Sequence, residues 1–447
     1  MTAPRGGTAR QRWFKSAALL VGIAVFSVRA SAEPVVGHLS APDLFELADR
    51  ARAAGRNADA SSIYDALMHD ANGDVRAEAR FRKGMMLAGA RRFADAAVMF
   101  RALLDEKPDA AGARLELARM LAAMGDETAA RREVRQVQAS GLPEDVAITV
   151  DQFARALRST RRFGGSLQVA IAPDSNVNRA TQARTLDTVI APLTLSDNAR
   201  AHSGVGLQFG AQGFARVDLS DHLSVLPRLS GAGTFYQSGA YNDVSGSALI
   251  GLEWRRGHAR FSPSIGQTWR WYGSAPYART ATASLDWLQP IGLRSQLSVH
   301  AGAARALYFR NTLQDGGLYD ASASFEHALT KRSGFGVTVS GYRQTARDPG
   351  YATVSLGTSA VAWRDLGKVT LVASSGLYRL EGDERLFLFA DRRREWLLKG
   401  SLAGTFRQLK VASFAPSFRV ILEQNKSTVA LYDYRRTAVE FGINRAF

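Results

Sequence analysis

The 447-residue sequence contains no cysteine. Disulfide frameworks and thiolate metal sites are therefore excluded, and so is a lipid anchor attached to a cysteine. The seven histidines stand singly, without the spacing of a zinc-hydrolase helix. Phosphate-binding loops, nucleophile elbows and dinucleotide fingerprints are also missing. These absences argue against an enzyme, and we expect no cofactor and no bound metal.

Apolar runs long enough to cross a bilayer as a helix are missing as well. The apolar stretch from Ala17 to Val28 follows a basic segment and is followed by Ala30-Ser31-Ala32. A basic start, a short apolar core and small residues at two alternate positions are typical of a secretory signal peptide. We therefore expect residues 1–32 to be a signal peptide, cleaved after Ala32. A retained membrane anchor is the alternative.

Acidic residues are scarce in the second part of the chain. Residues 33–158 hold 18 basic and 20 acidic side chains, whereas residues 159–447 hold 34 and 21. A basic excess of this size is compatible with nucleic-acid binding, but the basic residues are scattered without a stripe or a known motif. We favour an arginine-rich interior and rim of a membrane barrel, and expect no nucleic-acid partner.

Residues 33–158 have the apolar spacing of helices. The triplet Ala60, Tyr64 and Leu67 recurs 36 residues later and again after a further 34 residues. Small residues precede the later units, at Gly84 and Ala118. A period of 34 residues is that of tetratricopeptide repeats, which stack helix pairs into a concave surface for peptides or proteins. An unspecific alanine-rich bundle is the alternative. The recurring positions are Ala96, Phe100 and Leu103, then Ala130, Val134 and Val137.

Residues 159–447 alternate apolar and polar side chains instead. From His258 to Tyr272 the aromatic and aliphatic residues share one face, and serine, threonine and arginine share the other. Segments of about ten such residues, separated by turns, are typical of a lipid-embedded barrel, although a soluble sandwich alternates in the same way.

The connections favour the barrel. Six short turns alternate with seven longer polar links, which predicts a transmembrane antiparallel β-barrel of about 14 strands with both ends on the periplasmic side. The fold class is thus α plus membrane β. The short turns are Leu219–His222, Arg255–His258, Pro290–Arg294, Thr330–Ser333, Asp365–Lys368 and Arg407–Lys410. The longer links are Asp174–Ala199, Gln237–Asp243, Gly273–Ala278, Arg310–Gly317, Arg347–Gly350, Glu381–Arg394 and Gln424–Asp433.

The last residues form an amphipathic strand that ends in an aromatic residue. Phe441, Ile443 and Phe447 share one face, from which Arg445 departs. Such an ending resembles the signal by which the outer-membrane assembly machinery recognises its clients, and we expect these residues to serve as that signal.

A more specific motif stands where the two halves meet. Phe163, Gly164 and Gly165 lead into an alternating strand that ends in Pro173-Asp174-Ser175-Asn176-Val177-Asn178. With the tetratricopeptide region and the barrel, this motif resembles the surface lipoprotein assembly modulator family, also called type XI secretion translocons. Asp174, Ser175, Asn176 and Asn178 are also ordinary turn formers, which is the simpler interpretation of each one. The helical repeats depart from the usual pattern, because Arg80 and Arg114 stand where aromatic residues are common.

The resemblance implies an outer-membrane translocon that moves client proteins from the periplasm to the cell surface. The clients would be surface lipoproteins or soluble haem- or metal-scavenging proteins, and further partners would be the assembly machinery and the lipid bilayer. An exopolysaccharide exporter with tetratricopeptide repeats and a plain porin are the alternatives. A barrel enzyme would need a cluster such as His300 with Asp320 or Glu326, but polar residues lining a lumen are the more common case.

Overall fold

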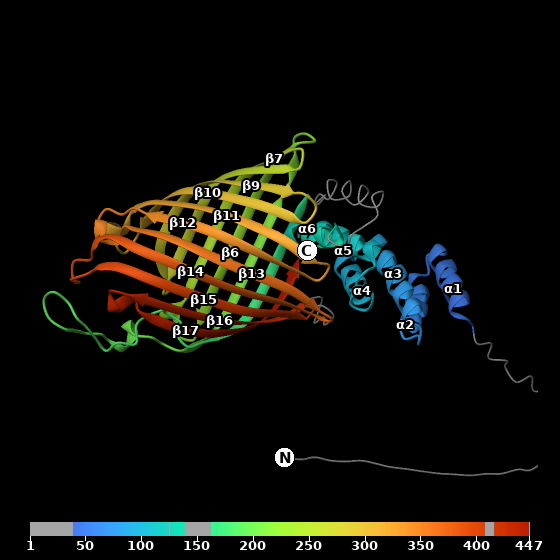
Figure 1. The fold of residues 1–447 in the computed structure, drawn as a ribbon, viewed down its shortest axis with the longest axis horizontal. Helices are drawn as coiled ribbons and strands as arrows, with labels where there is room; N and C mark the ends of the chain where they lie inside the picture. The colour runs from blue at the N-terminus through green and yellow to red at the C-terminus, as the bar shows by residue number, and fades with distance from the viewer. Residues whose placement is uncertain (1–38, 125, 139–161, 407–414, 447) are drawn as a thin grey trace, which may run out of the picture.

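The computed structural model describes residues 39–124, 126–138, 162–406 and 415–446. A row of helices stands at one end of a long barrel (Figure 1). The expected signal peptide with Ala30 and Ala32, the boundary between residues 158 and 159, and Phe447 lie outside the described residues. The described helices are α1 (Ala41–Ala53), α2 (Asn57–Leu67), α3 (Gly73–Gly89), α4 (Phe93–Glu106), α5 (Ala111–Ala123) and α6 (Glu127–Gln138).

The six helices form three stacked pairs, as the repeat predicts. All nine recurring positions are buried, from Ala60 in α2 to Val137 in α6. The cores of α1–α3 and of α3–α6 consist of residues of the helical domain alone. Each pair therefore buries its apolar face against the next pair, as stacked repeats do.

Gly84 shows why a small residue recurs in the first helix of a pair. A Cβ atom at this position would lie 2.8 Å from Cε1 of Phe100, which is fully buried in α4. The missing side chain lets α3 and α4 approach closely around that ring.

Arg80 and Arg114 replace apolar packing by ion pairs between paired helices. The Arg80 guanidinium lies 2.9 Å from Glu106 and holds the pKa of that carboxyl below its usual range. Arg114 is buried and donates to Glu133 at 2.8 Å and to Gln136 at 2.6 Å. The departure from the usual repeat therefore leaves the pairing of helices intact.

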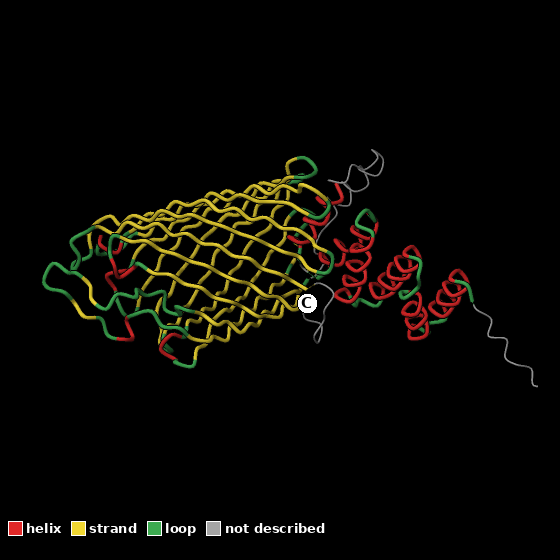
Figure 2. The backbone as a smooth tube through the Cα atoms, turned by 60° about the horizontal axis from the view of Figure 1, so that its bottom comes forward, coloured by secondary structure: helices red, strands yellow, loops and turns green. Residues whose placement is uncertain are grey.

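Fourteen antiparallel strands close into a barrel (Figure 2), which confirms the predicted fold class and strand number. The first strand pairs with the last, Ser166 opposite Ala446, and this seam closes the sheet. The strands are β1 (Phe163–Asp174), β4 (Gly204–Ala215), β6 (Leu223–Tyr236), β7 (Asp243–Arg256), β8 (Ala259–Tyr272), β9 (Ala275–Ile291), β10 (Ser295–Tyr308), β11 (Gly316–Thr330), β12 (Ser333–Gln344), β13 (Thr353–Leu366), β14 (Val369–Arg385), β15 (Arg392–Phe406), β16 (Ala415–Ser427) and β17 (Tyr434–Ala446).

The two faces of the sheet differ as the alternation predicts. Large apolar residues such as Ile250, Ile265 and Leu356 are exposed on the outside, where lipid covers them in a membrane. Hydroxyl groups pair between neighbouring strands on the inside, for example Ser264 with Ser284 at 2.9 Å. None of the described helices is long and apolar enough to cross a membrane.

Three of the longer links are shorter than predicted by four residues or more. The prediction of a loop over Gly273–Ala278 is wrong, because only Gly273 and Ser274 separate β8 from β9. Both residues have positive φ, +57° and +62°. Such a turn matches the twist of a hairpin, and Pro276 is tolerated near the start of β9. The link Glu381–Arg394 shrinks to residues 386–391 and the link Gln424–Asp433 to residues 428–433, because β14 and β16 run further than predicted. The predicted turn Arg407–Lys410 lies outside the described residues.

Candidate functional site

Helix α6 is the last helix of the row, and it lies at the open end of the barrel on that side (Figure 1). The Asp126 side chain accepts a hydrogen bond from the N–H of Ala129 at 2.9 Å and so caps the first turn. Ala130, Val134 and Val137 are buried within the helical domain. The same helix carries arginines at positions 131, 132 and 135.

Arg135 reaches from α6 onto the inner wall of the barrel. Its Nη1 donates to Gln296 Oε1 at 2.8 Å and its Nη2 donates to Glu326 Oε2 at 2.7 Å. Gln296 and Glu326 face each other across β10 and β11, so one guanidinium binds two neighbouring strands. Burial lowers the pKa of Arg135 to about 10, which still leaves it charged at neutral pH.

Two further contacts join the helical domain to the barrel. The Arg132 guanidinium lies over the ring of Trp363, 4.9 Å from its centre, and Trp363 is buried on the inside of β13. Gly334 leaves space for that indole, since a Cβ atom there would lie 2.3 Å from its Cζ2. Lys331, in the turn between β11 and β12, forms an ion pair with Asp109 in the link between α4 and α5. The contacts thus span β10 to β13.

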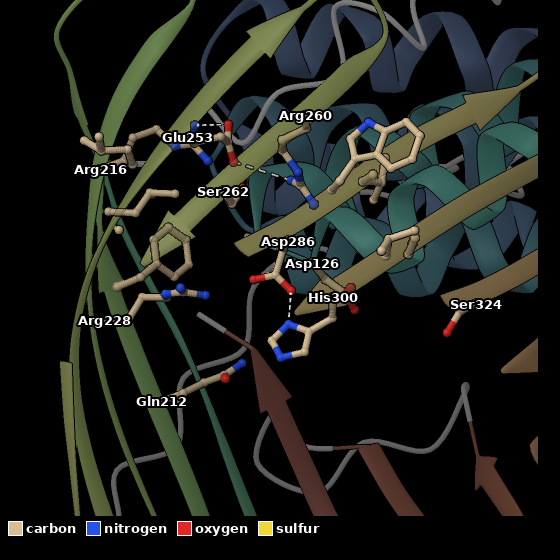
Figure 3. A pocket seen from close by; sticks show the side chains of 18 of the residues that line it. Asp126, Gln212, Arg216, Arg228, Glu253, Arg260, Ser262, Asp286, His300 and Ser324 are labelled. Carbon is tan, nitrogen blue, oxygen red and sulfur yellow. Dashed lines mark hydrogen bonds and ion pairs between the residues drawn. The ribbon is translucent and has the colours of Figure 1, made fainter. Parts of the chain in front are cut away.

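A cavity of about 730 Å³ opens inside the barrel next to this mouth (Figure 3). Met124 and Asp126 of the helical domain line it together with inward-facing strand residues. Glu253, only 3% exposed, accepts from Arg216 at 3.0 Å and forms ion pairs with Arg255 and Arg260. The cavity wall is therefore polar and carries paired charges of both signs, rather than the unbalanced arginine surface that the composition suggests.

His300 stands between two carboxylates in the same cavity. Its Nδ1 lies 2.8 Å from Asp286 and its Nε2 lies 2.9 Å from Asp320. Figure 3 shows the Asp286 contact. The structure thus joins His300 to Asp320, as a barrel enzyme would need, whereas Glu326 binds Arg135 instead. Because both ring nitrogens are engaged by carboxylates, neither is available as a base toward a hydroxyl nucleophile.

Metal binding finds no support in the described ranges. They contain no group of three or more histidine, aspartate or glutamate side chains in an arrangement that could hold a metal ion. The cavity has a polar wall that carries charges of both signs.

The motif at residues 173–178 organises the opposite end of the barrel. Asp174 closes β1 and binds Arg436 of β17 at 2.8 Å, and Arg436 also binds Glu423 of β16 at 3.1 Å. All three side chains are buried. Arg179, in the loop that follows β1, adds a second partner for Glu423 at 3.0 Å. The cluster therefore joins the first loop to the last two strands.

Two asparagines of the motif hold that loop. Asn176, 1% exposed, donates to the carbonyl groups of Ala180 and Arg435 and accepts from the N–H of Ala180. Asn178 donates to the carbonyl of Arg200 and accepts from the N–H of His202. Hydrogen bonds from side chains to nearby backbone groups are typical of turn-forming residues. Asn176 adds such a bond to Arg435 of β17. The two asparagines draw both ends of the loop over residues 175–203 together.

The outer loops cover this end with an apolar cluster. Leu186 of the first loop packs with Phe389 of the loop between β14 and β15 and with Val429 of the loop between β16 and β17. The N–H of Val189 donates to the carbonyl of Leu388 at 3.0 Å. Loops from distant parts of the chain thus form one lid.

The other residues of the predicted motif and signal lie along the closing seam. Phe163, Gly164 and Gly165 begin β1 at the helical end, and Gly165 lines the cavity. Pro173 pairs with Val205, and the N–H of Ser175 donates to the carbonyl of Thr437. Phe441 and Ile443 lie on β17, opposite Ile171 and Val169, and Phe441 is exposed on the outer face. Their proposed role as an assembly signal stays a prediction.

Sequence reasoning missed the contacts of α6. Arg132, Arg135, Gln296 and Trp363 carry no motif, and their partners are distant in the chain. Three arginines within one turn and a half of the last repeat helix were the available signal.

We expect the buried cluster around Arg436 to be a main source of barrel stability. Replacing Arg436 by Met leaves Asp174 and Glu423 buried without their shared counter-charge, which costs on the order of 3–5 kcal/mol. Urea unfolding of the barrel in lipid vesicles measures this loss. Arg419→Met is the control, because the Arg419 side chain is half exposed and pairs with the single carboxylate of Glu440, so we expect a smaller loss than for Arg436. Equal effects of the two substitutions would contradict the assignment.

Comparison with known proteins gives one extensive match. The family model described as surface lipoprotein assembly modifier matches residues 164–447, and a tetratricopeptide repeat model matches residues 87–146. No curated protein matches the sequence significantly.

Several solved outer-membrane proteins match the chain at low similarity. A loop-deletion mutant of OmpT, an outer membrane protein of Vibrio cholerae, is 9% identical over 64% of this chain and 98% of its own, with a TM-score of 0.37. OccAB1 of Acinetobacter baumannii is 8% identical over 64% of this chain and 97% of its own, with a TM-score of 0.35. Likeness at this level carries no argument about function.

Proposed function

The chain belongs to the surface lipoprotein assembly modifier family, and on that basis we propose that it is a translocon that moves client proteins from the periplasm to the cell surface. It is an outer-membrane barrel, and family and fold indicate transport or assembly rather than an enzyme. The proposed clients are surface lipoproteins, or soluble haem- or metal-scavenging proteins. The division into a signal peptide (1–32), a periplasmic helical domain (33–158) and a barrel (159–447) is part of the proposal.

The orientation follows from the connections. The two-residue turns after β7, β11 and β13 lie at the same end as the helices, and the lid of long loops lies at the other end. Outer-membrane barrels have short turns toward the periplasm and longer loops outside. The helical repeats are therefore on the periplasmic side.

The observation that carries the proposal is the contact of α6 with the inner wall of the barrel. A three-pair repeat offers a concave surface suited to a protein segment. Its last helix binds Gln296, Glu326 and Trp363 at the inner mouth of the lumen. A client held by the repeats is thus delivered to the mouth of the conduit.

Helix α6 is also the obstacle that a client meets there. Its contacts with the barrel include the ion pair of Arg135 with Glu326, the hydrogen bond of Arg135 with Gln296 and the cation–π contact of Arg132 with Trp363. Hydrogen bonds and ion pairs of this kind contribute only about 1–3 kcal/mol each, so a bound client can displace them. We propose that client binding to the repeats releases α6 from the wall.

The test uses a surface lipoprotein produced in the same cells as the client. Intact cells with and without the chain are treated with protease, and the cleaved fraction of the lipoprotein is measured. We expect surface cleavage with the chain and protection without it, at equal amounts of lipoprotein in the outer membrane.

Other outcomes identify the competing functions. Loss of an extracellular polymer without any change in protein display would indicate a polysaccharide exporter. Altered uptake of small solutes alone would indicate a porin. Either result, with unchanged cleavage of the lipoprotein, contradicts the proposal.

A further inference from the structure

The outer wall of the barrel has two arginines where lipid is expected. Arg279 on β9 and Arg305 on β10 are exposed on the outward face. Arg305 pairs with Ala281 and Leu307 pairs with Arg279, so the two arginines are diagonal neighbours. Diagonal neighbours on one face of a sheet lie about 7–8 Å apart, which lets two guanidinium groups bind one anion.

The outer face offers these arginines no carboxylate. Among β8 to β11, the acidic residues are Asp286, Asp320 and Glu326. All three face the lumen, where Asp286 and Asp320 bind His300 and Glu326 binds Arg135. A pair of positive charges on a lipid-facing wall without a counter-charge calls for an anion from outside the chain.

The height of the pair in the membrane is that of lipid headgroups. Arg279 is close to the start of β9 and Arg305 to the end of β10, both at the end of the barrel covered by the long loops. Trp269 lies directly opposite Arg279, and Tyr319 lies opposite Ala303, near Arg305. Exposed aromatic residues of this kind mark the interface of a membrane barrel.

A groove runs along the wall beside the arginines. It has a volume of about 1110 Å³ and includes Arg305 in its lining. Its sides are large apolar residues such as Leu229 and Ile265, and its floor includes Ala283 and Ala303. The groove is therefore mainly apolar, with the positive charge of Arg305 toward its outward end.

We propose that this groove binds a phosphate-bearing, multi-acyl lipid of the outer leaflet. The acyl chains occupy the groove over Ala283 and Ala303, and the phosphate accepts charge-assisted hydrogen bonds from Arg279 and Arg305. The proposal does not rest on the transport function, because it concerns the outer face and not the lumen.

Native mass spectrometry of the full chain in detergent tests the site. The probes are dioleoyl phosphatidic acid and dioleoyl phosphatidylcholine, which share their acyl chains. We expect tighter binding of phosphatidic acid, and a loss on the order of tenfold or more when both arginines are replaced, R279Q with R305Q. Arg256→Gln is the control. It removes an exposed arginine at the end of β7 that is nearest the helices, and we expect it to leave the binding of phosphatidic acid unchanged. Heat-modifiable gel migration verifies that each variant is folded.

A second variant separates the groove from the charges. Ala303→Phe keeps both arginines but fills the floor of the groove, so we expect it to weaken phosphatidic acid binding several-fold. Unchanged binding in this variant would mean that the arginines attract headgroups without a built site, and it would overturn the proposal. Equal binding of both lipids to the native chain would overturn it too. Binding that depends on Ala303 but not on the arginines would indicate an uncharged acyl ligand, such as a client anchor, and contradict the phosphate assignment.

Discussion

Removing residues 41–138 is expected to abolish surface display of the client while the barrel still folds. The helical cores contain only residues of the helical domain, and every strand of the barrel is paired on both sides by other strands. Each part thus has the contacts that it needs to fold alone. The deletion removes the surface that receives the client and the helix at the inner mouth together.

The deletion is tested by protease treatment of intact cells that carry the full chain or the shortened one. Heat-modifiable migration of the shortened chain serves as the control for folding. Undiminished display by a folded barrel without helices would show that the helical domain has no part in transport. A barrel that fails to fold would contradict the independence of the two parts.

Fixing α6 to the barrel wall is expected to stop display reversibly. Because the chain has no cysteine, two can be introduced without competing thiols. Arg135→Cys with Glu326→Cys replaces both partners of the ion pair and leaves no unpaired charge from it. A bis-maleimide with an internal disulfide joins the two positions. Display is expected to fall to the level of cells without the chain, and to recover when the internal disulfide is reduced.

A matched pair within the helical domain controls for the chemistry. Arg82→Cys with Asp49→Cys replaces another ion pair, with a distance of 2.6 Å, that joins α3 to α1. Cross-linking there leaves α6 free and is expected to preserve display. Full display with α6 fixed to the wall would show that the helix does not move during transport.

The architecture could be predicted because its signals are local. The buried triplets beginning at Ala60, Ala96 and Ala130 repeat at a helical period, and the strand alternation of residues 258–272 is visible in any ten residues. Burial on one face produces both patterns, whatever the tertiary contacts are. The predicted link Gly273–Ala278 is wrong because Pro276 is accepted near the start of β9, so that the strand begins at Ala275.

The site at the inner mouth could not be predicted in this way. Arg135 meets Gln296 and Glu326 across 161 and 191 residues of sequence. Nothing in the local pattern distinguishes an arginine that binds a barrel wall from one that faces water. The motif residues Asp174 and Asn176 were singled out as turn formers, and this was correct for their backbone bonds. Their link to Arg436 depends on the closure of the sheet and was not visible.

The ion pair of Asp174 with Arg436 has a consequence for the order of assembly. Its partners are 262 residues apart and belong to the first and last strands. Until synthesis and export of β17 are complete, the growing sheet has two unpaired edges, and such edges are prone to wrong pairing. The pairing of β1 with β17 has the largest sequence separation of any strand pair in the barrel. Contacts of large sequence separation form slowly, so we expect this pairing to be a slow step. The cluster can form only after that step, so a fluorescent pair across this seam would time the completion of the barrel in living cells.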